Sequence, residues 1–226
     1  QKTAYEISLG LVGSEMCIRD SIRGLHSKNK RSIIEPGNEV FATWSGRLET
    51  HLGNYNVEPI KLWSSHVLQF KDKLSAISSI CSLISLTMAE RQPNPIIYFS
   101  SKKLIEIVAS KREDWIREYV FWEMQLLSEI GYGLDLERCA VTSKSSDLVY
   151  VSPSSGRAVT NEGAGDFRNK LLPLPKFMTD FKANYDNDDI YNALNLTEFF
   201  FKKRFFLPNN LNFPQSRNRL KELFNH

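Results

Sequence analysis

Four basic side chains gather in a ten-residue stretch that contains no acidic residue. The stretch is IRGLHSKNKR at residues 22–31, and its cations are Arg23, Lys28, Lys30 and Arg31. Such a cluster is suited to binding the phosphates of a nucleic acid, because its charge displaces the counterions. Four contacts to a single strand would give a slope of about −3 for log affinity against log salt, from roughly −0.7 per phosphate. The alternative is a solvated basic loop without a ligand.

A further cation, Arg47, follows Trp44 on the same extended run. Arg47 would add a phosphate contact beside a ring on which a base can stack, an interaction worth about 1–3 kcal/mol. Trp44 also alternates with Val40 and Ala42, a pattern typical of the buried face of a strand. Both interpretations of Trp44 stay open, as a core ring or as a stacking platform, and Tyr55 is ambiguous in the same way.

A second basic group, Lys202, Lys203 and Arg204, lies inside the aromatic run at residues 199–206. One interpretation is an apolar groove with cations that receives an acidic, hydrophobic peptide. The alternative is a core helix whose basic residues point to solvent.

Motifs of enzymes are missing from the sequence. It contains no glycine-rich phosphate loop with lysine, no Gly-x-Ser-x-Gly and no His-Glu-x-x-His. The adjacent acids Asp188 and Asp189 stand at a predicted helix start, where they complement the helix dipole. We therefore expect no enzyme activity, no catalytic residues and no cofactor.

The composition is that of an ordinary globular protein. The 226 residues are 42% hydrophobic, with a net charge of +3 and a mean hydropathy of −0.33. No apolar run reaches the roughly 18–20 residues that cross a bilayer. The cysteines Cys17, Cys81 and Cys139 form no paired spacing, which suits a reducing compartment. We expect a cytoplasmic, nucleoid-associated protein without an export signal or a membrane partner.

The periodicity predicts strands first and helices afterwards. Alternating residues at 39–47 and 53–59 favour antiparallel strands, and the spacing of three or four from residue 64 onward favours helices. Ser64 or Ser65 would cap the first helix, and Gly131 would end the third. Helices are expected at 64–88, 96–110, 113–130, 188–206 and 214–224, two short strands within 147–160, and an extended connector at 171–175.

The first residues look foreign to the rest. The segment SLGLVGSEMCIRDS at residues 8–21 resembles the peptide produced when a sequencing adaptor is translated as coding sequence. Its apolar residues fit neither a strand period nor a helix period. We therefore treat residues 1–21 as a non-native artefact.

Three later blocks resemble the RecO family of recombination mediators, in the family's order. They are EPGNEVFATWSGRLETHLGNYNVEP at 35–59, GYGLDLERCAVTSKSSDLVYVSPSSGRAVTNEGAGDFRNKLLPLPKF at 131–177 and LTEFFFKKRFFLPNNLNFPQSRNRL at 196–220. The resemblance implies an α+β, predominantly helical fold. It consists of a partial N-terminal OB-fold β module at 22–62, whose first strands are absent, and a helical domain at 63–226 with a small β-turn insertion.

The resemblance also implies a function. A RecO-like protein would bind and anneal single- and double-stranded DNA. With RecR, it would help to load recombinase onto DNA coated by single-strand-binding protein. The C-terminal tail of that coating protein would bind the helical domain, for which Lys202, Lys203 and Arg204 are the candidates. The alternative is a protein-interaction scaffold for single-strand-binding protein alone, which has lost DNA binding by truncation.

Many members of this family carry a four-cysteine zinc site in the second block. Its frame falls on Cys139, Thr142, Thr160 and Gly163, of which only the first supplies a thiolate. No histidine lies between His66 and His226 to substitute. We therefore expect no zinc, with Cys139 as a small, partly buried apolar residue.

Overall fold

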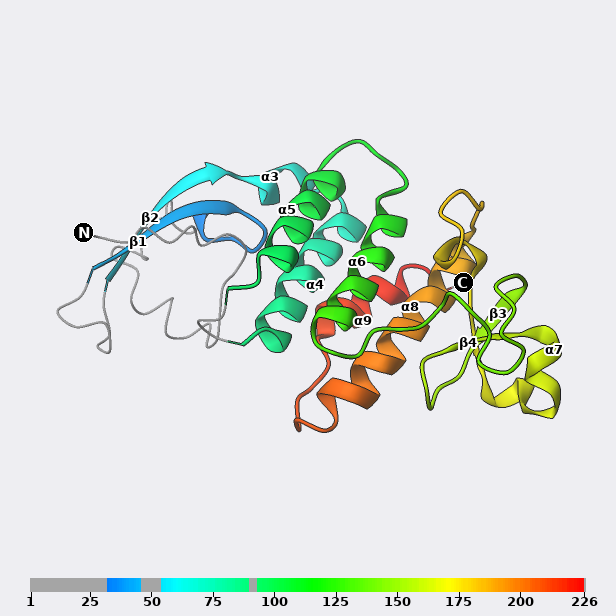
Figure 1. Ribbon diagram of the computed structural model, residues 1–226. Helices are drawn as coiled ribbons and strands as arrows, with labels where there is room; N and C mark the ends of the chain where they lie inside the picture. The colour runs from blue at the N-terminus through cyan, green and yellow to red at the C-terminus, as the bar shows by residue number, and fades with distance from the viewer. Residues whose placement is uncertain (1–31, 46–53, 90–92, 226) are drawn as a thin grey trace. The chain divides into compact units, whose positions relative to one another are not determined.

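The fold is that of a computed structural model, which describes residues 32–45, 54–89 and 93–225 (Figure 1). The chain forms two compact units, the first ending at Arg112 and the second beginning at Glu113. The first unit holds two strands and three helices among its described residues, and the second holds mainly helices with a small sheet. The predicted mixed, predominantly helical fold class is confirmed. The OB-fold and the boundary at residues 62/63 stay predictions.

Two antiparallel strands open the first unit. β1 (Glu39–Ser45) pairs with β2 (Asn54–Lys61), with Ala42 opposite Val57. Both strands were predicted, and Ala42 is buried as its alternation indicated. The side-chain surroundings of Trp44 and Tyr55 lie outside the described part of the chain, so their role stays open.

A tight turn precedes β1 and is fixed by side-chain contacts. Gly37 has a φ of +90°, and a Cβ there would lie 2.3 Å from Ile77 Cγ2, so only glycine fits. Asn38 Nδ2 donates to Ser32 O at 2.8 Å, and Asn38 Oδ1 accepts from Ser64 N at 2.9 Å. The Pro-Gly-Asn signal of the sequence therefore marks a turn that joins β1 to the helices.

Three helices complete the first unit: α3 (Trp63–Val67), α4 (Lys71–Thr87) and α5 (Pro95–Ala109). The predicted single helix from residue 64 is wrong, because Phe70 is extended (φ −109°, ψ 103°) and separates α3 from α4. The predicted cap is also wrong, since Ser65 Oγ donates back to Leu62 O at 2.7 Å. α5 begins as expected, with Asn94 Oδ1 accepting from Ile97 N at 3.0 Å.

The second unit is built on two long helices that lie side by side, α6 (Trp115–Glu129) and α8 (Asn187–Phe201) (Figure 1). Gly131 ends α6 with a φ of +85°, as predicted from its position. Asp186 and Asp189 form a capping box at the start of α8. The short helix α9 (Gln215–Glu222) contributes the fully buried Leu220.

A three-stranded sheet forms the β-turn insertion. β3 (Leu148–Val151) lies between β4 (Ala158–Thr160) and β5 (Leu172–Pro173), with both neighbours antiparallel to it. The two predicted strands are confirmed, and the predicted connector also pairs as β5. Between β4 and β5 run the short helices α7 (Asn161–Ala164) and η1 (Gly165–Lys170), and η2 (Lys176–Met178) follows β5.

The end of α8 changes its hydrogen bonding. Residues Lys202–Phe206 form one π-helical turn, η3, after which the chain leaves the helix. Phe206 packs edge-on against Phe213 with ring centroids 5.1 Å apart, and Phe201 lies beside both. The predicted helix to residue 206 is confirmed in extent, with its last turn widened. Within the described ranges, no helix has the length and hydrophobicity to traverse a membrane.

Candidate functional site

The residues proposed to contact DNA are not placed by the structure. Arg23, Lys28, Lys30, Arg31 and Arg47 all lie outside the described residues. Their role therefore stays a prediction from the charge pattern of the sequence.

The three cations at the end of α8 are placed on η3, and each contacts a different acceptor. Lys202 Nζ lies 2.5 Å from Glu198 Oε1, one turn earlier on the same helix. Lys203 Nζ donates to the carbonyl of Pro153 at 2.9 Å, and Arg204 Nη2 donates to that of Ser154 at 3.3 Å. The contacts of Lys203 and Arg204 therefore attach η3 to the turn between β3 and β4.

Gly156 makes room for this contact. Its φ is +76°, and a Cβ on it would lie 3.0 Å from Arg204 Nη2 and 3.2 Å from Leu134 Cδ2. The guanidinium of Arg204 also lies over the ring of Phe200, 4.8 Å from its centroid. A side chain larger than hydrogen at position 156 would therefore require the Arg204 guanidinium or the turn to shift.

The net charge of this helix end stays positive. Glu198 lies between Lys202 and Lys221, whose Nζ is 2.7 Å from Glu198 Oε2. Burial of Glu198 opposes its ionisation, but hydrogen bonds from the two lysines outweigh burial and lower its pKa. A contact to a carbonyl orients a cation without cancelling its charge. Lys203 and Arg204 contact carbonyl oxygens, with Leu207 69% exposed just beyond them.

The cysteine loop differs from its prediction. Cys139 is 1% exposed, and its Sγ accepts hydrogen bonds from the backbone N–H groups of Val141 at 3.4 Å, Thr142 at 3.3 Å and Thr160 at 3.3 Å. Burial opposes its ionisation, but donors on Thr142 and Thr160 prevail and lower the pKa of Cys139 to about 6. The description of Cys139 as a partly buried apolar residue is therefore wrong, because it is a fully buried polar acceptor.

The four positions at which the resemblance would place zinc ligands meet at this sulfur. Thr160 Oγ1 lies 3.5 Å from Cys139 Sγ and 3.4 Å from Thr142 Oγ1, and it accepts from Gly163 N at 3.0 Å. Structural zinc is bound by four ligands, usually thiolate or imidazole. One thiol, two neutral hydroxyls and a glycine do not make such a set, so the residues present do not fit zinc.

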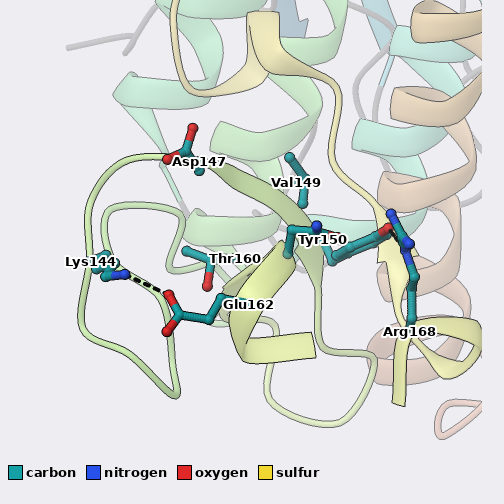
Figure 2. Close-up of a pocket in the computed structure, with 8 residues that line it drawn as sticks. Lys144, Asp147, Val149, Tyr150, Thr160, Glu162 and Arg168 are labelled. Atoms are coloured by element: carbon teal, nitrogen blue, oxygen red, sulfur yellow. Dashed lines mark hydrogen bonds and ion pairs between the residues drawn. The ribbon is translucent and has the colours of Figure 1, made fainter. Parts of the chain in front are cut away.

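A surface hollow of about 530 Å³ opens beside this loop and was missed from the sequence. Figure 2 shows Lys144 and Glu162 on one side of Thr160, joined by a 2.5 Å ion pair, and Arg168 on the other side. Arg168 Nε donates to Tyr150 Oη. The lining holds two cations, Lys144 and Arg168, and two anions, Asp147 and Glu162, so its formal charges sum to zero. Lys144 and Glu162 are 18 residues apart in the sequence, as are Tyr150 and Arg168, so no short motif in the sequence predicted the hollow.

Comparison with known proteins covers the cysteine loop, the small sheet and the end of α8. The model of the family described as "Recombination protein O C terminal" matches residues 71–210, which include the cysteine loop and η3. The chain is similar to the DNA repair protein RecO of Ruegeria sp. (strain TM1040), with 38% identity over 81% of this chain and 75% of that protein.

Two further relatives extend the likeness. The DNA repair protein RecO of Paracoccus denitrificans (strain Pd 1222) is 37% identical over 83% of this chain and 75% of its own length. That of Roseobacter denitrificans (strain ATCC 33942 / OCh 114) is 34% identical over 90% of this chain and 84% of its own length. The likeness therefore extends over most of the chain.

Proposed function

The chain belongs to the RecO family, and on that premise we propose that it acts in DNA repair as a recombination mediator. In this proposal it binds single- and double-stranded DNA, anneals complementary strands and, with RecR, helps to load recombinase onto DNA coated by single-strand-binding protein. No step needs a bond to be broken. Cations neutralise phosphates, and the second unit binds the coating protein, at the nucleoid in the cytoplasm.

The observation that carries the proposal is the family membership over most of the chain, including the two strands of the first unit. For DNA binding, the support is the acid-free cluster at residues 22–31, to which Arg47 would add a contact. For partner binding, the support is the end of α8. Two basic residues, Lys203 and Arg204, lie there beside the exposed Leu207, which suits a peptide that is both acidic and apolar.

The DNA-binding part is tested by anisotropy of a labelled single-stranded oligonucleotide, titrated with the chain at several salt concentrations. We expect a slope near −3, from roughly −0.7 per phosphate, and loss of binding in Lys28→Glu/Lys30→Glu/Arg31→Glu. The control carries the same charge change at three exposed lysines, as Lys111→Glu/Lys176→Glu/Lys182→Glu.

The two triple variants separate local from general electrostatics. Equal losses would assign binding to the net charge of the chain rather than to residues 22–31. A folded sample that binds no DNA at low salt would rule out the mediator proposal for this chain. It would leave the alternative, a scaffold that binds single-strand-binding protein only.

A further inference from the structure

The loops that follow Cys139 and Thr160 approach each other closely without a covalent link. Cys139 N donates to Lys144 O at 2.8 Å and Ala140 N donates to Ala158 O at 2.8 Å, so backbone bonds close the first loop and join it to β4. The side chains of Cys139, Thr142 and Thr160 then fill the space between the loops. In a zinc knuckle that space belongs to the metal and its ligands.

We propose that these loops form a metal-independent knuckle, in which hydrogen bonds from Thr160 to Cys139 Sγ join the loops in place of a zinc ion, while Thr142 closes the first loop on the same sulfur. The sulfur is the first centre of the arrangement. It accepts three peptide N–H bonds at 3.3–3.4 Å and has the Thr160 hydroxyl at 3.5 Å. Two of the N–H groups follow Cys139 directly, whereas the donors of Thr160 come from 21 residues later.

Thr160 is the second centre. Its Oγ1 accepts from Gly163 N at 3.0 Å and so caps α7, while lying within 3.5 Å of both Cys139 Sγ and Thr142 Oγ1. One hydroxyl thus connects three of the positions at which metal-binding relatives would have ligands. The fourth position, Gly163, adds only its backbone. Each contact is weak alone, but all are buried or half-buried, where an unmade bond is costly.

The first test asks whether a metal depends on Cys139. The full chain and Cys139→Ala are incubated with zinc sulfate, desalted and analysed for zinc by mass spectrometry. We expect the same zinc content in both, because the described residues bring no four-ligand set together at this place. A content that is higher by one ion per chain in the natural sequence overturns the proposal.

The second test asks whether the hydroxyl and the sulfur act together. Thr160→Val removes the hydroxyl and keeps the shape of the side chain, and we expect it to lower the unfolding midpoint by a few degrees. Thr179→Val is the control, because its exposed hydroxyl donates to Lys176 O at 3.1 Å in the same unit. In a Cys139→Ala background the effect of Thr160→Val should shrink. Strict additivity of the two changes overturns the proposed link.

The third test restores the ligands. Thr142→Cys/Thr160→Cys/Gly163→Cys, with Cys139 unchanged, should bind one Co²⁺ per chain, seen as thiolate charge-transfer absorption that the natural chain lacks. A Cβ at position 163 would lie 3.1 Å from Cys139 Sγ, so the sulfur has to shift by a few tenths of an ångström. A folded triple variant that binds no Co²⁺ overturns the proposed frame. If that variant does not fold, the first two tests decide.

Discussion

Arg217 and Glu123 form an ion pair in the interior of the second unit: Arg217 Nε lies 2.5 Å from Glu123 Oε1, and neither side chain is exposed. Glu123 also accepts from Tyr119 Oη at 2.9 Å and from Thr197 Oγ1 at 2.6 Å. Arg217 Nη2 donates to Leu194 O at 2.8 Å. The pair therefore joins α6, α8 and α9, and its charges are solvated by protein groups instead of water.

Removing one partner should destabilise the fold strongly. Arg217→Met leaves the Glu123 carboxylate buried without its cation, at a cost of about 3–5 kcal/mol in the free energy of unfolding. Glu123→Leu/Arg217→Met should be less destabilised than either single variant, because no unpaired charge remains. Urea titrations followed by circular dichroism measure the effect. Lys144→Ala breaks an exposed ion pair and serves as the control. A loss from Arg217→Met no larger than that from Lys144→Ala would contradict the role given to the pair.

The stability of the second unit should rise with pH through Cys139. Its pKa is lowered from 9.0 to about 6 in the folded chain, so the thiolate's contribution is full above pH 9 and is lost as the pH falls toward 6. The difference in unfolding free energy between the natural chain and Cys139→Ala should therefore grow from pH 6 to 9, by at most about 1.4 kcal/mol per pH unit. Urea titrations at pH 6, 7.5 and 9 measure it.

Cys81 provides the control for this pH dependence. Its burial raises the pKa to about 12, so the thiol stays neutral throughout the same window. The difference between the natural chain and Cys81→Ala should be constant from pH 6 to 9. The neighbours of Cys139 do not titrate there either, since their hydrogen bond raises the pKa of Lys144 and lowers that of Glu162. Parallel curves for the two cysteine variants would refute a thiolate at position 139.

Gly156→Ala should cost more than Gly131→Ala. Both glycines have positive φ, which costs an alanine about 1–2 kcal/mol. A Cβ at position 131 meets nothing within 4 Å, whereas one at position 156 lies 3.0 Å from Arg204 Nη2. The additional loss of stability at position 156 then measures the contribution of the contact between Arg204 and the turn. Unfolding midpoints of the two variants compare them directly, and equal shifts would mean that Arg204 adjusts freely.

Binding of an acidic peptide with an apolar end should depend on both kinds of residue at the end of α8. Lys203→Glu reverses a charge that contacts a carbonyl and pairs with no carboxylate among the described residues, and Leu207→Ser removes an exposed apolar side chain. We expect each to weaken binding on the order of tenfold, equivalent to about 1.4 kcal/mol. Only the Lys203→Glu effect should diminish at high salt. Fluorescence anisotropy of a labelled peptide measures binding, with Lys182→Glu as the control. Unchanged affinity in both variants would place the peptide elsewhere.

Local signals accounted for most of the elements. The alternation of apolar residues predicted β1 and β2, and their helical spacing predicted α5, α6 and α8. Gly131 marked the end of α6. The break at Phe70 escaped prediction because the helical spacing of apolar residues continues across it. The π-helical turn escaped for a similar reason, since Lys202, Lys203 and Arg204 are good helix formers and the widening accompanies the contact with a turn 50 residues earlier.

The polar centres of the second unit could not be predicted from spacing. Glu123 lies within an apolar repeat, and its partner Arg217 follows 94 residues later. At the cysteine loop, nothing local showed that Thr160 would bring its donors to the sulfur of Cys139. Such pairs are created by the tertiary fold, and one sequence without its structure contains no period that reveals them.

The order of strands in the small sheet has a consequence for how this protein can vary. β3 is central, so the chain leaves the sheet after Thr160 at the end of β4 and returns at Leu172 on the other side of β3. The segment between them, with α7 and η1, therefore starts and ends in the same small sheet. A segment of this kind can be lengthened or trimmed at little cost in loop closure. Relatives can therefore differ in length between β4 and β5 without rebuilding the helical core.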